Sequence, residues 1–460
     1  MTKKKISHDF DPLYDSLRSH LAVSRRDYAW RIGQLKALLR MIQENNQALS
    51  QAMWADLHKP AFECAVTEQG LVIAEIEHAL KYLAQWMRPR SVATPLYNQP
   101  GHCEVHHDPF GLVLIIGAWN YPVQLLLAPL VGALAGGNAV ILKPSELAVQ
   151  TAEVLAKLVP EYLDKNLIAV VQGGAEETSQ LLDKNFDFIF FTGSSPVGKI
   201  VMGKAAQNLT PVVLELGGKS PAIVLADADI AVTARRIAWG KFMNAGQTCV
   251  APDSILAVPA VKERLVLEIK KNIRQFYGED PRYSPDYCRI LNTKNFDRLM
   301  AFLKDAKVLH GGANNREELF IEPTLLESKF DDEIMQYEIF GPLLPILEIS
   351  DVEQAVQWVN SHPKPLALYL FTEHSPTQSY VLERTSSGGA CINDVVMQMP
   401  VPQLPFGGVG ASGMGHYHGH YSFETFTHAK GVLRKGTWLD LPLRYAPYSL
   451  RKSKWLRWLF

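Results

Sequence analysis

Residues 111–142 read GLVLIIGAWNYPVQLLLAPLVGALAGGNAVIL, an apolar stretch without a single charged side chain. It is long enough to cross a bilayer, so a membrane span is one interpretation. Its glycine, proline and asparagine residues, however, divide it into a strand over 112–116, a helix over 122–135 and a strand over 139–142. We therefore interpret the stretch as a buried β-α-β unit.

The alternation of strands and helices continues on both sides of this unit. Residues 25–90 place apolar residues at helical spacing with charges between them, and predict two or three amphipathic helices. Short apolar runs predict further strands over 168–171, 188–191, 212–214, 222–225, 254–258, 342–349 and 367–371. Strands that alternate with helices are typical of a parallel sheet wrapped on both faces, so we predict an α/β fold.

The length of 460 residues favours two or three domains. A second series of alternating strands and helices begins near Val212. We assign the strands over 212–214 and 222–225 to this second unit. A domain boundary is therefore expected close to Glu215.

The composition excludes several classes of protein. Lys and Arg number 46 against 47 Asp and Glu, so the chain lacks the basic footprint of a nucleic-acid-binding protein. Residues 1–9 contain lysines, but no apolar run follows them, which argues against a secretory signal peptide. The five cysteines are scattered and form no CxxC pair, a usage that suits a reducing, cytoplasmic compartment.

The C-terminal stretch 434–460 is the one strongly charge-biased segment. It holds seven Lys or Arg and one acid, interleaved with Trp438, Trp455, Trp458 and Phe460. One interpretation is a solvated tail or a docked terminal helix. The other is a basic amphipathic element that contacts a membrane or an apolar substrate.

Cys249 lies in the stretch 244–250, which reads NAGQTCV. Small and polar neighbours surround it, and Gly246 permits a close backbone approach, whereas an inert cysteine more often lies inside an apolar run. A nucleophilic cysteine needs access and a lowered pKa. The residues alone leave both roles open for Cys249, while the other four cysteines look structural.

Two polar residues lie beside predicted strand ends. Glu215 stands between Leu214 and Leu216, where burial would raise its pKa and suit a general base, although a buried ion pair is the alternative. Asn120 follows the strand over 112–116, at the edge where open α/β sheets bind ligands. Its amide can donate to an oxyanion or stabilise the turn.

Three further motifs are candidate ligand sites. The stretch 191–198, FTGSSPVG, follows a strand and opens a helix, with Ser195 as the expected cap; such a helix start binds phosphates, but an ordinary turn has the same pattern. The stretch 217–220, GGKS, imitates a P-loop but has Val213 where that motif needs glycine. The histidines within 416–420 lack companion ligands, so no metal site is predicted.

Together these stretches resemble the aldehyde dehydrogenase superfamily, most closely its class 3 branch of fatty, aromatic and coniferyl aldehyde dehydrogenases. The resembling motifs are WNYP at 119–122, KPSE at 143–146, FTGS at 191–194, LELGGKSP at 214–221, GQTC at 246–249, EIFGP at 338–342 and PFGGVG at 405–410. They follow the order of the family and span nearly the whole chain.

The resemblance implies two doubly wound α/β domains, one for the cofactor and one for catalysis, and a small dimerisation arm. The corresponding division is N-terminal helices and an NAD(P)-binding domain over 1–214, a catalytic domain over 215–395, and a bridging and dimerisation segment with the basic aromatic tail over 396–460. It also implies a cytoplasmic homodimer that uses NAD or NADP. Peripheral membrane contact through the tail is the additional expectation.

The mechanism implied by the resemblance begins with attack of the Cys249 thiolate on an aldehyde. The oxyanion of the resulting thiohemiacetal would be held by Asn120 and the Cys249 N–H. Hydride passes to the nicotinamide, and Glu215 activates the water that releases a carboxylic acid from the thioester. Medium or long aliphatic aldehydes and aromatic aldehydes are the substrates that the family suggests.

The resemblance also assigns cofactor contacts. The residues concerned are Lys143 and Glu146 at the adenosine ribose, Gly193, Ser194 and Gly198 along the pyrophosphate, and Glu338 with Phe340 at the nicotinamide ribose. Tyr337 departs from the family, because many members carry a second glutamate there. The chain also ends at Phe460, whereas fatty aldehyde members often continue into a membrane-spanning helix.

Two alternative functions are kept. The first is an acylating or reductive variant, in which a thiol such as coenzyme A takes the acyl group in place of water. The second is a catalytically silent binding relative. The presence of both Cys249 and Glu215 argues against a silent protein.

Overall fold

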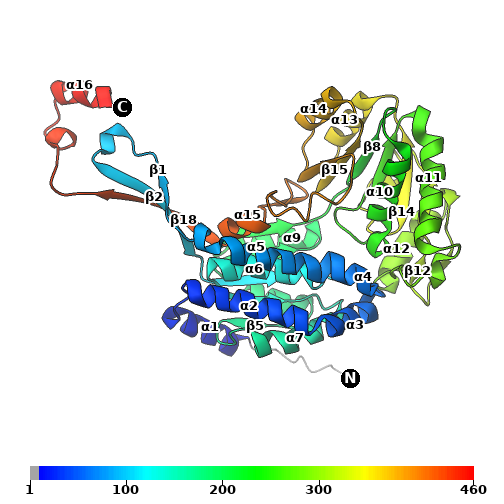
Figure 1. Cartoon of the computed structure of the whole chain (residues 1–460), viewed down its shortest axis with the longest axis horizontal. Helices are drawn as coiled ribbons and strands as arrows, with labels where there is room; N and C mark the ends of the chain where they lie inside the picture. The colour runs from blue at the N-terminus through cyan, green and yellow to red at the C-terminus, as the bar shows by residue number, and fades with distance from the viewer. Residues whose placement is uncertain (1–9, 460) are drawn as a thin grey trace.

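The computed structural model describes residues 10–459, with side chains through Lys454, and consists of two lobes and a projecting arm (Figure 1). Residues 1–9, which carry the prediction on a signal peptide, lie outside the described residues. The same holds for the side chains of Trp455, Trp458 and Phe460 in the predicted aromatic tail.

The first lobe is built on a six-stranded sheet, parallel except for its edge strand β17. In spatial order its strands are β17 (Gly413–Met414), β7 (Val212–Glu215), β6 (Phe188–Thr192), β3 (Leu112–Ile116), β4 (Ala139–Lys143) and β5 (Ile168–Val170). Its helices are α1 (Asp11–Val23), α2 (Tyr28–Glu44), α3 (Asn46–Leu57), α4 (Ala61–Cys64), the π-helical turn η1 (Ala65–Gln69), α5 (Gly70–Trp86), α6 (Gln124–Gly136), α7 (Val149–Tyr162), α8 (Ala175–Leu182), α9 (Ser195–Ala206) and α15 (Gly419–Thr425).

The second lobe is built on a seven-stranded sheet, parallel except for its edge strand β10. In spatial order its strands are β10 (Lys307–His310), β13 (Thr324–Glu327), β14 (Leu343–Glu348), β9 (Ser254–Ala257), β8 (Pro221–Val224), β15 (Ala367–Phe371) and β16 (Gly389–Ile392). Its helices are α10 (Ile230–Phe242), α11 (Pro259–Tyr277), α12 (Thr293–Leu303), α13 (Val352–Ser361) and α14 (Ser375–Arg384); β11 (Asn314–Asn315) and β12 (Phe320–Ile321) form a small hairpin. Two parallel sheets with interposed helices confirm the predicted α/β fold class.

The arm consists of three antiparallel strands that project from the first lobe (Figure 1). They are β1 (Arg90–Val92), β2 (Gly101–Pro109) and β18 (Thr427–Lys435), followed by α16 (Leu450–Leu459) near the C-terminus. Two of the three strands thus come from residues 90–109, which the sequence-based division placed in the N-terminal domain. The domain division itself stays a prediction.

The apolar stretch 111–142 forms β3, α6 and β4, and every residue of these three elements is buried. The predicted β-α-β unit is therefore confirmed. Among the described residues, no helix combines the length and apolar character needed to cross a membrane.

Two helices begin later than their local sequence predicts, because remote carboxylates bind their free N–H groups. Helix α6 begins at Gln124, two residues after Pro122, and Glu68 accepts hydrogen bonds from the N–H groups of Val123 (3.0 Å) and Gln124 (2.9 Å). Helix α7 begins at Val149, although Ser145 is a residue type that favours a helix start four residues earlier, and Asp56 accepts from its first turn at Gln150 and Thr151.

Strand β7 corrects the assignment of the second unit. The alternation of strand and helix patterns in the sequence grouped residues 212–214 with the strands that follow. In the structure, however, β7 pairs in parallel with β6 in the first sheet. β8 is the first strand along the chain that belongs to the second sheet. The local pattern of apolar residues cannot distinguish the last strand of one sheet from the first strand of the next, since both are short, buried and apolar.

Candidate active site

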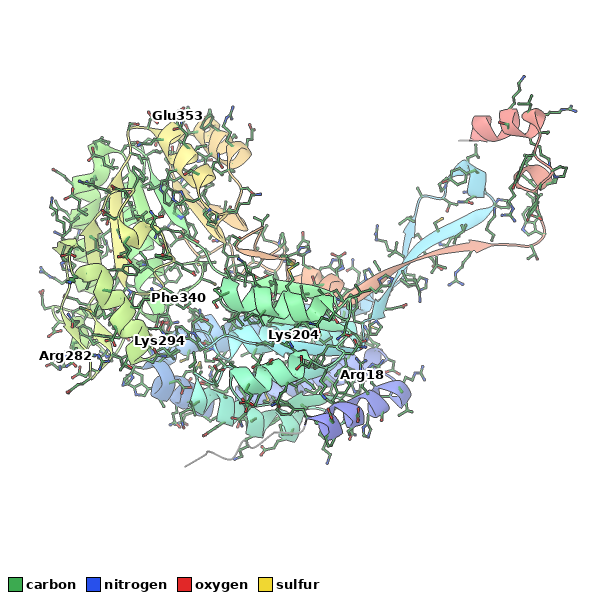
Figure 2. All side chains as sticks on the ribbon, turned by 180° about the vertical axis from the view of Figure 1, so that it is seen from behind. Arg18, Lys204, Arg282, Lys294, Phe340 and Glu353 are labelled. Atoms are coloured by element: carbon green, nitrogen blue, oxygen red, sulfur yellow. The ribbon has the colours of Figure 1, made fainter. Side chains whose placement is uncertain are left out.

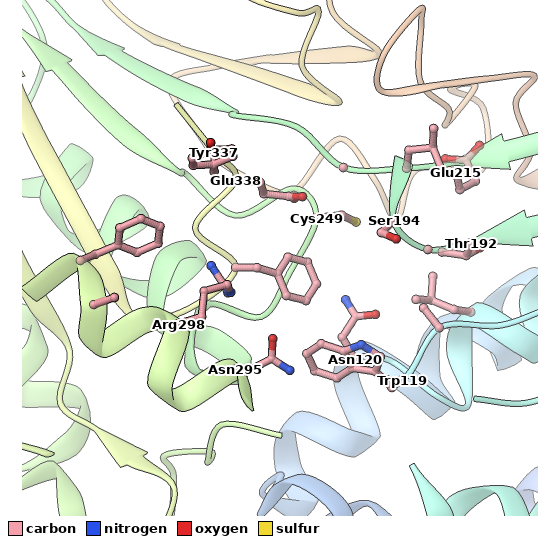
Figure 3. Close-up of a pocket in the computed structure, with 18 of the residues that line it drawn as sticks. Trp119, Asn120, Thr192, Ser194, Glu215, Cys249, Asn295, Arg298, Tyr337 and Glu338 are labelled. Atoms are coloured by element: carbon pink, nitrogen blue, oxygen red, sulfur yellow. The ribbon is translucent and has the colours of Figure 1, made fainter. Parts of the chain in front are cut away.

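A cavity of about 630 Å³ lies between the two lobes, where the carboxyl ends of β3, β6 and β7 face the second lobe (Figure 3). This is the edge at which open parallel sheets bind ligands. The predicted site residues that line it are Asn120, Gly193, Ser194, Glu215, Cys249, Glu338 and Phe340. Three others lie outside its lining: Lys143, Glu146 and Gly198.

Cys249 follows a short, irregular turn, η3 (Met243–Gly246), after helix α10. Three consecutive residues, Asn244, Ala245 and Gly246, have φ of 52°, 50° and 74°, in the left-handed region that is costly for side chains with a Cβ. At Gly246 a Cβ would lie 2.3 Å from a facing carbonyl oxygen, so only glycine fits there. The resulting reversal of the chain delivers Cys249 to the cavity wall.

Buried amides join the Cys249 loop to the loop that carries Asn120. Nδ2 of Asn244 donates to the carbonyl oxygens of Asn120 (2.8 Å) and Gln247 (3.1 Å). Nδ2 of Asn120 in turn donates to the Gln247 carbonyl at 3.0 Å. A primary amide has two N–H donors, so Asn120 keeps one for a ligand oxygen.

The Cys249 thiol does not have the lowered pKa that the sequence analysis expects of a nucleophile. Burial, followed by the charges of Glu338 and Glu215, raises its pKa to about 12. The N–H groups of Cys249 and Val250 favour the thiolate but do not outweigh burial. The thiol therefore needs a base or a further positive charge before it can attack.

Glu215 ends β7 with a side chain that is 2% exposed, and this burial raises its pKa well above the usual value. Neither carboxyl oxygen has a hydrogen-bond partner among the described residues. The alternative of a buried ion pair therefore has no support in the described part of the chain. A raised pKa makes the carboxylate of Glu215 a stronger base, as a general base requires.

Glu338 lies against the turn after β7. A Cβ on Gly217 would approach its carboxyl oxygen to 2.2 Å, so the glycine makes room for the acid. Burial and the charge of Asp253 raise the pKa of Glu338 to about 8, against the opposing effect of the Gly218 N–H. Oε1 has no partner among the described residues and is free to accept from a ligand.

Phe340 lies between the two lobes (Figure 2) and has a left-handed φ of 49°. Its ring meets that of Trp119 edge to face, with the ring centroids 5.4 Å apart. The two rings thus face each other from opposite lobes.

Helix α9 begins at the end of β6, as predicted, but its cap differs. Ser194, not Ser195, occupies the N-cap position, and its hydroxyl caps no N–H of the described helix. Gly198 lies one turn further, where a Cβ would come within 2.8 Å of Leu216. The glycine therefore lets α9 pack closely on the turn after β7, which brings the helix start to the cavity.

Lys143 and Glu146 lie together at the end of β4. The Lys143 ammonium is buried, donates to the Pro144 carbonyl at 2.7 Å and lies 3.7 Å from the Glu146 carboxylate. The Glu146 side chain is 47% exposed. The pair is thus one strand further along the sheet from β3, beyond the main cavity.

A second cavity, of about 290 Å³, shares Cys249 and Glu215 with the first. Its lining is largely apolar and includes Leu71, Trp239, Met243, Val396, Met399 and Tyr417. Cys249 and Glu215 therefore stand where the first cavity, which offers more polar groups than the second and is called the polar cavity below, meets the apolar cavity.

Asn295 and Arg298 of α12 line the polar cavity, and sequence reasoning missed both (Figure 3). Arg298 donates to the Ile339 carbonyl at 2.7 Å, beside Glu338. The only signal in the sequence is an amphipathic helix, and that pattern does not show which face borders the site.

Of the three histidines within 416–420, His418 is buried whereas His416 and His420 are exposed. His418 is buried with Nδ1 2.7 Å from a Glu75 oxygen. Among the described residues, no cluster of three or more His, Cys, Asp or Glu side chains could hold a metal ion.

Comparison with known proteins gives concordant matches. The sequence model of the aldehyde dehydrogenase family matches residues 17–432. The chain is 48% identical to the dimeric NADP-preferring aldehyde dehydrogenase of Rattus norvegicus over 411 residues, 89% of this chain and 91% of that protein. It is 46% identical to the 4,4'-diaponeurosporen-aldehyde dehydrogenase of Staphylococcus aureus over 97% of this chain and 98% of that protein.

The fold agrees with a solved relative. The substrate-bound structure of Staphylococcus aureus AldH superposes with a TM-score of 0.96 at 44% identity, covering 98% of this chain and 99% of that one. The extent of the family match and of these identities shows that the chain belongs to the aldehyde dehydrogenase family, whose members oxidise aldehydes with NAD or NADP.

Proposed function

We propose that this aldehyde dehydrogenase oxidises apolar aldehydes, medium or long aliphatic or aromatic, to carboxylic acids, with Cys249 as nucleophile, Asn120 as oxyanion donor and Glu215 as general base. The observation that carries the proposal is the position of Cys249 and Glu215 at the junction of the two cavities. A carbonyl carbon at that junction can meet the thiol while its apolar substituent fills the second cavity.

The residues of the polar cavity fit a dinucleotide. Thr192 Oγ1 and Glu338 Oε1 are buried without partners among the described residues, and Ser194 begins a helix whose N-terminus favours phosphate. We assign Ser194, Gly193 and Gly198 to the pyrophosphate, Glu338 and Phe340 to the nicotinamide ribose, and Lys143 and Glu146 to the adenosine ribose. When bound, NAD or NADP supplies the hydride acceptor.

The first chemical step is formation of the carbon–sulfur bond. A thiol with a pKa of about 12 is protonated at neutral pH, so Glu215, at the same junction, is suited to take its proton. As sulfur attacks, the carbonyl oxygen becomes an oxyanion. The free N–H of Asn120 and the Cys249 N–H are placed to donate to it, and one such donor is typically worth about 100- to 1000-fold in rate.

The second chemical step releases the acid. After the tetrahedral carbon has lost hydride, a thioester remains on Cys249. Once Glu215 has passed the thiol proton to solvent, it takes a proton from water, the hydroxyl oxygen bonds to the acyl carbon, and the carbon–sulfur bond breaks as Glu215 returns the proton to the sulfur. Because neither oxygen of Glu215 is engaged by a described residue, the carboxylate is free to bind that water.

The apolar cavity supports the proposed substrate class. Its walls offer Trp239, Met243 and Met399, and Glu215 at the junction is the only Asp, Glu, Lys or Arg among the described residues that line it. A relative named for the aldehyde of the apolar compound 4,4'-diaponeurosporene agrees with this class. Turnover with a series of aldehydes of increasing chain length, with NAD and with NADP, measures both preferences.

Pre-steady-state kinetics of Glu215→Gln test the mechanism. The variant is expected to give a slower burst of reduced cofactor, equal in amplitude to the enzyme concentration, and then to stall, because thiol deprotonation and deacylation both lack their base. Normal steady-state turnover would remove Glu215 from this role. Acyl-coenzyme A formed when coenzyme A is added to the wild type would favour the acylating alternative.

We also propose a cytoplasmic homodimer whose basic tail contacts a membrane surface peripherally. The arm supports a dimer because it projects from the first lobe and exposes Leu96, Tyr97 and Leu433 by 60%, 43% and 44%. Trp438 and the basic residues of α16 suit an anionic lipid surface. Light scattering gives the oligomeric state, and sedimentation with anionic vesicles tests the tail.

A further inference from the structure

A buried ion pair lies behind the Asn120 loop, outside both cavities. Lys59 and Glu68 have no exposed side-chain surface, and Nζ lies 2.6 Å from Oε1. Burial alone would lower the pKa of Lys59, but the charges of Glu68 and Glu63 outweigh it and raise that pKa. The lysine is therefore held as a cation inside the first lobe.

The remaining bonds of this pair go to one short segment of chain, 120–124. Lys59 Nζ donates to the Asn120 carbonyl oxygen at 2.9 Å and lies 3.9 Å from the centre of the Tyr121 ring. Glu68 Oε2 accepts from the N–H groups of Val123 and Gln124. The pair thus fixes both ends of the segment, the cation on its carbonyl end and the carboxylate on its N–H end.

On its other side, the segment 120–124 is hydrogen-bonded to the Cys249 loop. Asn244 donates to the Asn120 carbonyl oxygen that Lys59 also contacts, and Asn120 donates to the Gln247 carbonyl. The Tyr121 hydroxyl lies 2.7 Å from Oγ1 of Thr248, the residue before Cys249. A shift of the Asn120 backbone would therefore move the oxyanion donor relative to the sulfur.

The chain forms this arrangement at a local cost. Glu68 lies in the π-helical turn η1, a rare conformation that is frequent at functional sites. Gly70 permits the turn, because a Cβ there would lie 2.5 Å from the Ala65 carbonyl oxygen. A buried ion pair generally adds little stability over apolar side chains of the same size. Its bonds to the 120–124 segment supply a different reason for its presence.

We propose that Lys59, held by Glu68, is a positioning residue for the oxyanion donor: it acts on the chemical step through Asn120 and touches neither substrate nor cofactor. The proposal rests on the proposed role of Asn120. It extends the active site to a buried pair that belongs to neither cavity.

The test is a double-mutant cycle on the burst of reduced cofactor. Lys59→Met/Glu68→Gln removes the Nζ contact without leaving Glu68 as an unpaired carboxylate, and the amide oxygen introduced at position 68 keeps an acceptor for the two N–H groups. We expect the burst rate to fall about 10- to 100-fold, since a misplacement of about 1 Å can cost about 100-fold in rate. KM for the cofactor should stay within about twofold. In an Asn120→Ala background the same substitutions should slow the burst by less than about threefold.

Arg31→Met is the matched control. Arg31 is a buried cation that donates to the Ala135 carbonyl at 2.8 Å, at the opposite end of the same helix α6. It should lower the melting temperature without a selective effect on the burst. Equal slowing by Lys59→Met/Glu68→Gln in both backgrounds, or by Arg31→Met, would overturn the positioning role.

The failure of this inference is distinguishable from failure of the proposed function. A wild-type burst in Asn120→Ala alone would remove Asn120 as oxyanion donor. A slow burst in Asn120→Ala with additive effects would leave that role intact and overturn only the role of Lys59. If Lys59→Met/Glu68→Gln does not fold, Lys59→Met alone, which removes the same Nζ contact, enters the same cycle with the same criteria.

Discussion

Two buried lysine–carboxylate pairs, one in each lobe, hold the two loops that face each other across the cavity. In the first lobe Lys59 and Glu68, 2.6 Å apart, hold the Asn120 loop. In the second lobe Lys219 and Asp253, also 2.6 Å apart, hold the loop that carries Glu338.

The bonding of the second pair mirrors that of the first. Lys219 donates to the carbonyl oxygens of Ile334 and Tyr337, and Asp253 accepts from the N–H of Ile339. In both pairs the cation binds carbonyl groups and the carboxylate binds N–H groups of one loop. The two lobes thus fix their loops with the same kind of ion pair, one at the proposed oxyanion donor and the other at the proposed ribose ligand.

The largest effect is expected from removing the Cys249 thiol, the proposed nucleophile. Cys249→Ala should lower aldehyde oxidation by at least about 10⁴-fold, because loss of a nucleophile removes the covalent route. Cofactor binding, measured by calorimetry, should be retained. Retained turnover, or labelling of another side chain by a reactive aldehyde, would contradict the assignment of Cys249 as the nucleophile.

The first loop is tested by Asn120→Ala. We expect the burst of reduced cofactor to slow by about 100- to 1000-fold, the usual cost of one oxyanion donor. The KM for cofactor should change little, because the substitution lies on the chemical side of the cavity. If stopped-flow absorbance shows a burst at the wild-type rate, the Asn120 loop does not act on the chemical step.

The second loop is tested by Lys219→Met. Loss of this cation frees the loop that carries Glu338, so KM for the cofactor should rise by about tenfold, equivalent to about 1.4 kcal/mol. The burst rate at saturating cofactor should stay within about threefold. Lys262→Met is the control, because Lys262 pairs with Glu327 in the same lobe without contacting the loop. If Lys219→Met slows the burst as much as Asn120→Ala does, the Glu338 loop also acts on the chemical step, and the two loops do not differ in function.

The smallest expected effect is electrostatic and concerns the sulfur itself. Only the thiolate is alkylated, so with a pKa of about 12 the rate with iodoacetamide in cofactor-free enzyme should rise about tenfold per pH unit from pH 7 to 10. Glu338 raises that pKa, so Glu338→Gln should lower it and speed alkylation about two- to fivefold at pH 9. A plateau of the wild-type rate near pH 7 would contradict the high pKa.

Much of the fold could be predicted because buried parallel strands have a clear signature. The strand predicted over 112–116 agrees with β3 to the residue, and the neighbouring α6 and β4 shift only at their ends. The errors have a common cause. The starts of α6 and α7 are set by Glu68 and Asp56, which are distant in sequence, and the sheet to which β7 belongs is set by pairing.

The candidate site divides in the same way. Cys249, Glu215 and Asn120 can be found by chemistry that is unusual for a loop, a strand end and a turn. Arg298 and Lys59 cannot, because a charged residue on an amphipathic helix or near its end is ordinary in sequence. Even Lys219, inside a stretch that imitates a P-loop, shows its role only through its contacts with Asp253 and the Glu338 loop.

The order of residues along the chain by itself determined the α/β class, the β-α-β unit at its centre and the candidates for the reactive side chains, because periodicity, turn chemistry and side-chain type are local properties. Only the tertiary structure decided that the half-buried thiol would have a raised pKa, that two cavities would meet at it, and which lysines would fix the facing loops. Burial and charge depend on groups brought together from distant segments, and that proximity exists only once the chain has folded.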